Sequence, residues 1–130
     1  LELVLHELAD RAIGHQGEDG RRNLAAGLQG GLGMAASGNI HPGKTSLFEP
    51  VHGSAPPLAG RNLANPMGAI LSAGLLLRHL GWSDEAHAVE SAVQRVIRER
   101  RGTPDVGGTL GTVETGDAIL DAIRAGQAGA

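Results

Sequence analysis

The sequence predicts an α/β fold, because stretches with strand character occur together with segments that have helical spacing. Extended stretches are expected at 34–40 and 46–51, and three helices are expected after them, at 66–80, 83–101 and 113–124. Strands and helices that occur together in a short chain bury their apolar faces best as packed layers. With 130 residues, the chain has the length of one domain and can bury ~65% of its unfolded surface.

The first third of the chain predicts helices separated by glycine-rich breaks. Apolar residues recur at helical spacing before Gly14, so 1–13 is expected to form an amphipathic helix. These residues are Leu1, Val4, Leu5, Leu8, Ala12 and Ile13. A polar, glycine-rich linker follows at 14–20, and a short helix is expected at 24–29, before the glycines of 30–33.

A turn is expected between the two strands, and a loop is expected after the second strand. The residues of 34–40 are expected to be extended, and the His-Pro-Gly-Lys-Thr sequence of 41–45 favours a turn. The segment 46–51 then reads as a strand that delivers a glycine- and proline-rich loop.

The segment 66–80 is apolar almost all round, which is typical of a helix buried against a sheet. Ala73 and Gly74 are small enough to allow a close approach of neighbouring elements. Gly81 is expected to end this helix, because glycine readily adopts the left-handed conformation found just after helix C-termini.

Two further helices complete the expected fold. Ser83 is predicted to begin a helix whose arginines after position 97 suit its negative C-terminal end. Its expected buried stripe consists of Ala86, Val89, Val93, Val96 and Ile97. The last helix is expected at 113–124, with Thr112 as its N-cap.

The composition argues against several classes of function. The net charge is −3 with dispersed charges, and the chain has one Trp, one Phe and no Tyr, so it offers neither a basic patch nor stacking platforms for nucleic acid. Without cysteine it has no disulfide or thiolate site. Residues 1–13 lack the features of a signal peptide, and the longest apolar run, 67–77, is too short to cross a bilayer. The expected localisation is therefore cytoplasmic.

The loop between 51 and 66 has the composition of a ligand-binding loop. Gly53 and Gly60 allow close backbone approach or a positive φ, and two prolines between them stiffen the chain. Asn65 is a predicted N-cap, with Pro66 at the first helical position. A rigid loop at a helix N-terminus presents backbone N–H groups to an anion, whereas the alternative is a loop that only connects a strand to a helix.

The same loop carries a family resemblance. The run Phe48-Glu-Pro-Val-His-Gly-Ser-Ala-Pro56, with Ala-Gly at 59–60 and Ala-Asn-Pro at 64–66, resembles the cofactor loop of the β-decarboxylating dehydrogenases. This family comprises 3-isopropylmalate, isocitrate, homoisocitrate and tartrate dehydrogenases. Segments 23–39, 103–108 and 112–119 resemble its neighbouring motifs. The resemblance covers about residues 19–130 and is strongest to 3-isopropylmalate dehydrogenases, with tartrate dehydrogenases next.

The resemblance implies a fold and a division of the chain. The expected fold is a partial three-layer α/β sandwich of the isopropylmalate dehydrogenase type, of which the chain supplies the C-terminal portion. Residues 1–20 would be a non-matching helix and linker, 21–46 a remnant of the dimer and substrate domain, and 47–130 the cofactor loop and C-terminal helices of the large domain. Because family members are long two-domain enzymes and the chain begins with Leu1, we expect a fragment or truncated product.

NAD is the cofactor that the resemblance implies. By analogy, the side chains of His52 and Asn65 would contact the adenosine portion, while backbone groups at 53–55 would face the phosphates. The expected cofactor-binding residues are His52, Gly53, Ser54, Ala55, Pro56, Pro57, Leu58, Ala59, Gly60, Arg61, Asn62, Leu63, Ala64 and Asn65.

The choice between NAD and NADP lacks its usual determinant. Members that use NAD carry an aspartate directly after the His-Gly-Ser-Ala-Pro run, where it bonds the adenosine ribose, and this chain has Pro57 there. Proline neither accepts a hydrogen bond through its side chain nor pairs with a 2′-phosphate, so both cofactors stay open, with NAD favoured.

A divalent metal ion is also implied. The family holds Mg²⁺ or Mn²⁺ with two aspartates four residues apart, and Asp19 and Asn23 have this spacing here. Asp19 is the expected ligand, whereas Asn23 lacks the second carboxylate. The alternative is that this stretch is a solvated polar linker.

The expected chemistry belongs to a longer enzyme. The family oxidises a 2-hydroxy acid by hydride transfer and then releases CO₂, using a tyrosine, a lysine and an arginine cluster. The chain has no Tyr, its one lysine, Lys44, lies in a turn, and no arginine cluster matches. We therefore expect no catalytic residue and no catalysis by this chain alone. The complete enzyme is expected to be a homodimer that acts on a small 2-hydroxy acid such as 3-isopropylmalate. Alternatives are an inert nucleotide-binding remnant or a truncated subunit that docks through the helix at 67–80.

Overall fold

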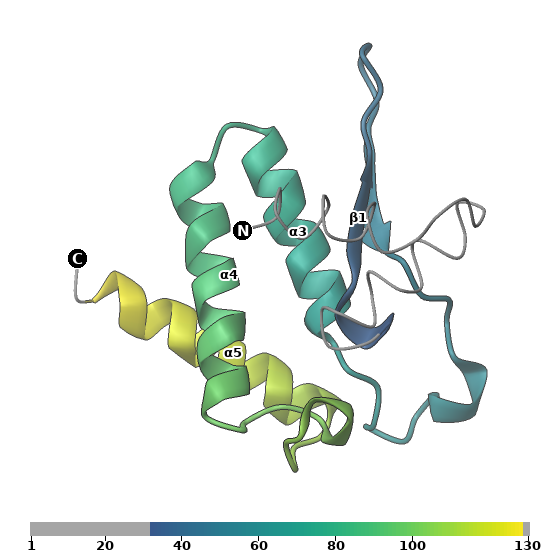
Figure 1. Ribbon diagram of the computed structural model, residues 1–130, viewed down its shortest axis with the longest axis vertical. Coiled ribbons are helices and arrows are strands. Elements are labelled where there is room, and N and C mark those ends of the chain that lie inside the picture. Colours follow the sequence, from purple (N-terminus) through teal and green to yellow (C-terminus); the bar gives the residue numbers. More distant parts are fainter. Residues whose placement is uncertain (1–31, 129–130) are drawn as a thin grey trace, which may run out of the picture.

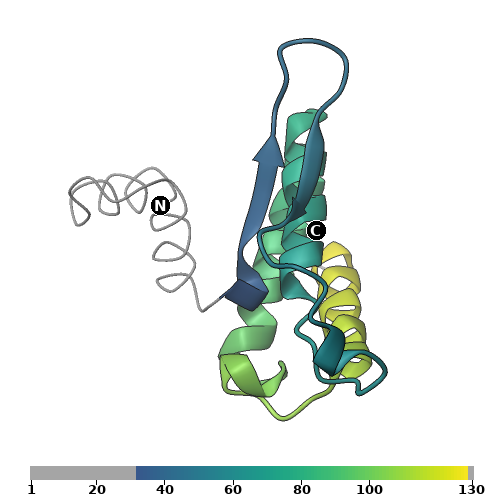
Figure 2. The same cartoon turned by 90° about the vertical axis from the view of Figure 1, so that its right-hand side faces the viewer.

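A two-stranded hairpin and three helices make up the part of the chain, residues 32–128, that this computed structural model describes. A short 3₁₀ turn, η1 (Leu32–Met34), leads into β1 (Ala36–Asn39), which pairs antiparallel with β2 (Leu47–Pro50). The register runs from Ala36 opposite Pro50 to Asn39 opposite Leu47. Both predicted strands are confirmed with slightly tighter bounds, and the exposed turn between them stands clear of the helices (Figure 2).

Helix α3 (Met67–His79) packs along one face of the hairpin and contacts both strands (Figure 1). At one end of this contact the Phe48 and His79 rings lie 5.3 Å apart between centroids. At the other end, a Cβ on Gly68 would lie 2.9 Å from the Gly33 carbonyl oxygen, so glycine is what allows the helix to approach so closely. This confirms the prediction of a helix packed against strands.

The close approach expected at Ala73 and Gly74 is confirmed only for the glycine. Gly74 is buried against α4 (Ser83–Arg98), where a Cβ would lie 3.5 Å from a methyl carbon of Val89. Ala73 is exposed, because it lies on the remaining free side of α3. Leu76 and Leu80 are 40% and 55% exposed, so only part of the helix at 67–80 is open for docking.

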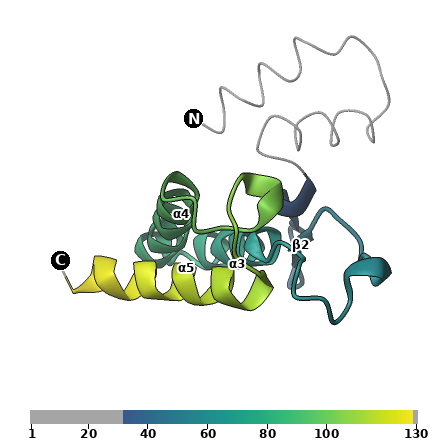
Figure 3. The same ribbon diagram turned by 90° about the horizontal axis from the view of Figure 1, so that it is seen from below.

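The core forms where the three helices meet. Helix α3 contacts α4, and α4 contacts α5 (Thr112–Gln127); in Figure 3, α3 lies between β2 and α4. The buried core residues are Met67, Ala92, Val93, Val96, Ala118 and Ile119. Three of the five residues in the predicted stripe of α4 are buried, and Val89 and Ile97 are half-buried. Within residues 32–128, no helix is long and apolar enough to span a bilayer.

Helix α3 ends at the predicted glycine, Gly81. Gly81 has φ of +86° and donates its N–H to the Arg78 carbonyl oxygen, while the Trp82 N–H donates to the Leu77 carbonyl oxygen. These two bonds form a Schellman motif, which requires a left-handed residue at the position of Gly81.

Gly81→Ala is expected to lower the free energy of unfolding by ~1 kcal/mol, because a Cβ disfavours the left-handed conformation. Gly116→Ala is the matched control, since Gly116 lies inside α5 with nothing within 4 Å of a Cβ. That change should stabilise the protein by ~0.5–1 kcal/mol. Urea denaturation followed by circular dichroism measures both, and two changes of the same sign would contradict the prediction.

The predicted end of α4 and the predicted start of α5 are wrong. The N-cap of α5 is Gly111, whose φ of −82° and ψ of −178° are extended, and Thr112 is the first helical residue. Helix α4 ends at Arg98 instead of continuing to Arg101, because Arg100 takes a positive φ of 54° that no helix continues through. The expected helices at 1–13 and 24–29 lie outside the described residues, and the division into 1–20, 21–46 and 47–130 stays a prediction.

Candidate functional site

The loop between β2 and α3 follows a path defined by three left-handed residues. Ala55, Gly60 and Asn62 have φ of 43°, 73° and 54°. Between the first two lies a short 3₁₀ turn, η2 (Pro56–Leu58), closed by a 2.9 Å bond from the Leu58 N–H to the Ala55 carbonyl oxygen. Of the two glycines expected to allow a special backbone, Gly60 uses a positive φ. The left-handed Ala55 had no signal in the sequence, whereas Asn62 is a residue type that tolerates this conformation but was not singled out.

The first limb of the loop is open to solvent. His52, Gly53, Ser54 and Ala55 are all exposed, and a Cβ at Gly53 would have no atom within 4 Å. Among the residues that the structure describes, no hydrogen bond engages the backbone N–H groups of 53–55. His52 Nδ1 donates to the Gly53 carbonyl oxygen at 2.8 Å, and its Nε2 lies 3.2 Å from where a Cβ on Gly68 would be, at the start of α3. This limb therefore presents backbone donors that bond none of the described residues.

The second limb of the loop, residues 60–65, is bound to the N-terminus of α5. The Asn62 carbonyl oxygen accepts from the Thr112 N–H at 3.1 Å, and Asn62 Oδ1 accepts from the Val113 N–H at 2.9 Å. The Thr112 hydroxyl, which was the predicted N-cap, instead donates to the Ala64 carbonyl oxygen at 2.5 Å. Asn62 thus caps a helix that begins 50 residues later in the sequence.

Glu114, in the first turn of α5, also bonds the Asn62 side chain. Its Oε2 accepts from Asn62 Nδ2 at 2.8 Å. That bond, followed by bonds from backbone N–H groups of the first turn, holds the pKa of the exposed Glu114 carboxyl below its ordinary value of 4.5. Because the folded pKa is the lower one, the carboxylate stabilises the fold above the ordinary pKa. This contribution is lost as pH falls through the folded pKa.

The last residue of the loop is tied to the segment before α5. Asn65 Oδ1 accepts from the Met67 N–H at 2.9 Å, so Asn65 bonds the first residue of α3. The predicted N-cap position is nevertheless wrong by one residue, because the N-cap is Pro66 and the helix begins at Met67. Asn65 Nδ2 donates to Asp105 Oδ2 at 2.9 Å, and Asp105 Oδ1 accepts from the hydroxyl of the fully buried Thr103. The segments 103–108 and 112–119, which resembled a C-terminal signature, therefore hold both ends of the second limb.

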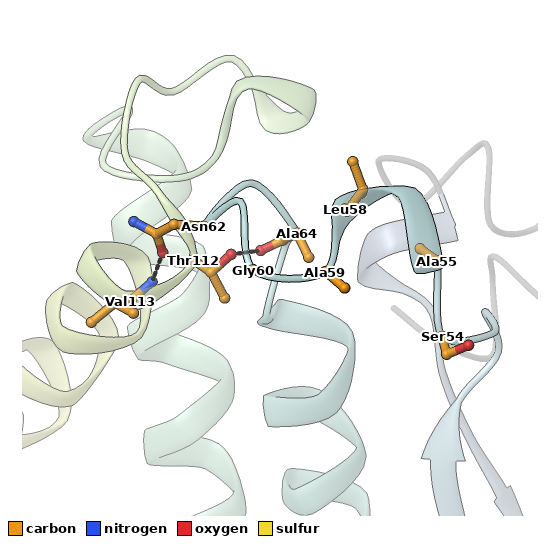
Figure 4. Close-up of a pocket in the computed structure, with 9 residues that line it drawn as sticks. All are labelled: Ser54, Ala55, Leu58, Ala59, Gly60, Asn62, Ala64, Thr112 and Val113. Carbon is orange, nitrogen blue, oxygen red and sulfur yellow. Dashed lines mark hydrogen bonds between the residues drawn. The ribbon is translucent and has the colours of Figure 1, made fainter.

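A hollow of about 430 Å³ lies between the loop and α5 (Figure 4). It is lined by Ser54, Ala55, Leu58, Ala59, Gly60, Asn62, Ala64, Thr112 and Val113. Most of these side chains are small and apolar. Ligand pockets typically combine such apolar walls with a few polar groups, and here the neighbouring polar groups are the N–H groups of the first limb, which bond no described residue.

The remaining predicted site residues are not gathered here. Asp19 and Asn23, the expected metal site, lie outside the described residues. Within 32–128, no group of three His, Asp or Glu side chains is close enough to hold a metal ion. Lys44 is exposed in the turn between the strands, at the other end of β2 from the loop.

A sequence profile of the isocitrate/isopropylmalate dehydrogenase family matches residues 21–122. The chain is 50% identical to a 3-isopropylmalate dehydrogenase of Archaeoglobus fulgidus over 97 residues, which cover 75% of this chain and 29% of that enzyme. It is 56% identical over 90 residues to the 3-isopropylmalate dehydrogenase of Methanothermobacter thermautotrophicus, covering 69% and 27%. An isocitrate/homoisocitrate dehydrogenase of Thermus thermophilus is 50% identical over 102 residues, covering 78% and 30%.

Solved structures agree with these sequence matches. Isocitrate dehydrogenase from Methylococcus capsulatus superposes with a TM-score of 0.75 and 43% identity, over 78% of this chain and 31% of that one. A β-decarboxylating dehydrogenase from Thermococcus kodakarensis gives a TM-score of 0.71 and 39% identity, over 78% and 30%. The fold is therefore a partial α/β sandwich of the isopropylmalate dehydrogenase type, and the chain spans 27–30% of the length of these curated relatives. The chain belongs to the isocitrate/isopropylmalate dehydrogenase family.

Proposed function

We propose that the chain is the C-terminal portion of an NAD-dependent oxidative decarboxylase of a 2-hydroxy acid such as 3-isopropylmalate. In this proposal, the loop from His52 to Asn65 binds the adenosine and phosphate part of NAD. The observation that carries it is the pairing of an open, donor-rich limb at 53–55 with a second limb that is held in place by α5.

The described residues fit a dinucleotide. Backbone N–H groups at 53–55 that bond no described residue can donate to phosphate oxygens, and the absence of a side chain at Gly53 leaves room for a ligand to approach them. The apolar hollow, whose lining includes Ser54 and Ala55 of the same limb, suits an aromatic ring. Bound NAD would supply the acceptor for the hydride, and this chain's residues would bind and orient its adenosine end.

The other groups that the reaction requires are proposed to lie elsewhere in a longer, dimeric, cytoplasmic enzyme. The sequence has no tyrosine for a proton relay, and Lys44 lies on the exposed turn between the strands. A metal ligand at Asp19, for Mg²⁺ or Mn²⁺, stays a proposal. The same lack of catalytic groups favours a second candidate, a nucleotide-binding remnant that is inert by itself. Both candidates predict that this chain alone binds nucleotide without turnover.

Titration of the isotope-labelled chain with ADP, followed by NMR, tests the binding role. We expect saturable shifts of the amides of Gly53, Ser54 and Ala55, since these donors face the proposed phosphate position. Adenosine is the control, and it should bind more weakly because it lacks the phosphates. A parallel titration with NAD and NADP decides which cofactor the loop prefers without an acidic residue at Pro57. Absence of saturable binding at millimolar ADP would contradict the proposal.

A further inference from the structure

The first turn of α5 lacks a side-chain cap of its own. The first N–H groups of a helix have no acceptor within it, and a Ser, Thr, Asp or Asn at the N-cap usually supplies one. The N-cap here is Gly111, and the acceptors come from Asn62, through its carbonyl oxygen to Thr112 and its side chain to Val113. The cap is thus delivered by the loop and not by the helix.

The arrangement matches a capping box divided between two segments. In the usual box the N-cap side chain accepts from a backbone N–H of the first turn, and a glutamate three residues later accepts from the N–H of the N-cap residue. Glu114 is three residues after Gly111, and its carboxylate lies against both the Gly111 backbone and Asn62 Nδ2. A Cβ at Gly111 would lie 2.2 Å from Asn62 Nδ2, so the loop asparagine occupies the place of the missing side chain.

The cap determines where one wall of the hollow lies. Asn62 has a φ of 54°, a conformation that asparagine tolerates better than most residues. Two residues later the Ala64 carbonyl accepts from the Thr112 hydroxyl, so this limb is joined to α5 at two points. Thr112 and Val113 line the hollow together with Gly60. Release of Asn62 would loosen the loop side of the hollow, from Gly60 to Ala64. The limb at 53–55 has no such contact with α5 among the described residues.

We propose that Asn62 is a positioning residue, which completes the capping box of α5 and thereby holds the second limb of the cofactor loop in its binding conformation. Its side chain acts through the loop backbone and not by contact with the nucleotide, because both of its polar groups bond α5. The effect on nucleotide affinity rests on the function proposed above. The effect on loop order does not require any ligand.

Three variants test this role. Asn62→Ala removes the two side-chain bonds of the cap, to Val113 and Glu114, and keeps the carbonyl bond to Thr112. The double variant N62D/E114Q exchanges the amide and the carboxylate. The carboxylate at position 62 can still accept from the Val113 N–H, and it can also accept from the amide at position 114. Asn39→Ala is the control, since Asn39 is an exposed asparagine on β1, outside the loop and α5.

NMR order parameters of the amides from Gly60 to Ala64 are measured first, without nucleotide. We expect them to fall from ~0.85 to below ~0.6 in Asn62→Ala and to recover in the double variant. Exchange of the Val113 amide should become at least ~10-fold faster in Asn62→Ala only, which corresponds to ~1.4 kcal/mol. Asn39→Ala should match the wild type in both. ADP affinity, measured by calorimetry, should fall and recover in parallel with loop order.

The outcomes separate the two proposals. Unchanged order parameters in Asn62→Ala, or disorder that the double variant does not reverse, would overturn the positioning role. If the wild-type chain binds no ADP but the loop loosens in Asn62→Ala as expected, the positioning of the loop stands and the function proposed for it fails. If ADP binds the wild type and Asn62→Ala equally well, the positioning role in binding is wrong.

Discussion

Gly53→Leu is expected to weaken ADP binding by at least ~10-fold, or ~1.4 kcal/mol, while the stability of the fold stays unchanged. A Cβ at Gly53 would have no atom within 4 Å, so a larger side chain is accommodated by the protein. The same open space is where the nucleotide is proposed to approach the backbone N–H groups of 53–55. Calorimetric titration with ADP gives the affinity, and urea denaturation gives the free energy of unfolding, which should change by less than ~0.5 kcal/mol.

Gly126→Leu is the matched control for Gly53→Leu. Gly126 lies near the end of α5, also with nothing within 4 Å of a Cβ. This variant should bind ADP like the wild type, since it places the same side chain far from the loop. Equal ADP affinity of Gly53→Leu and the wild type would show that the ligand does not approach Gly53. A large loss of stability in Gly53→Leu would show that the glycine is needed for the fold.

Met67→Ala should have the largest effect on stability, with a loss of ~2–5 kcal/mol in the free energy of unfolding. The Met67 side chain is 0% exposed and belongs to the core cluster that joins α3 to α4 and α5. Its removal leaves a cavity that the surrounding helices fill only in part. Alanine keeps the backbone N–H that donates to Asn65, so the loss reports the core side chain and not this bond. Urea denaturation with circular dichroism measures the loss.

Leu76→Ala is the control on the same helix. Leu76 is 40% exposed, so truncation removes fewer buried contacts and should cost less than ~1 kcal/mol. The pair therefore separates burial from the general effect of shortening a side chain in α3. Equal losses for the two variants would mean that the helix end, and not the core cluster, limits the stability.

The elements and the family were accessible from the sequence because their signals are local. Apolar residues at period 3.6 placed α4 and its buried stripe, and the Gly81 stop placed the end of α3. The cofactor-loop run from Phe48 to Pro56 is contiguous, so it could be compared with a known family without knowledge of the fold. The family profile and the relatives then bore out that comparison.

The errors at the candidate site arose where a distant residue supplies what a local rule assigns to a neighbour. Thr112 fits the local rule for an N-cap, yet Asn62 caps α5 and the Thr112 hydroxyl turns to Ala64. Asp105 was not singled out, although it links Asn65 to the buried Thr103. In both cases the partners are 40 or more positions apart, and no spacing rule connects them.

Within residues 32–128, the sequence by itself determined which segments are helical or extended and where the glycine-rich loop lies, and it also showed which family the chain resembles, because these depend on neighbouring residues. Only the tertiary structure decided how the loop is held: Asn62 at the start of α5, Asn65 on Asp105, and a limb at 53–55 whose donors bond no described residue. Such hydrogen bonds depend on which segments the packing of α3, α4 and α5 brings within 3 Å or so of each other. That proximity is a property of the folded core and not of any stretch of sequence.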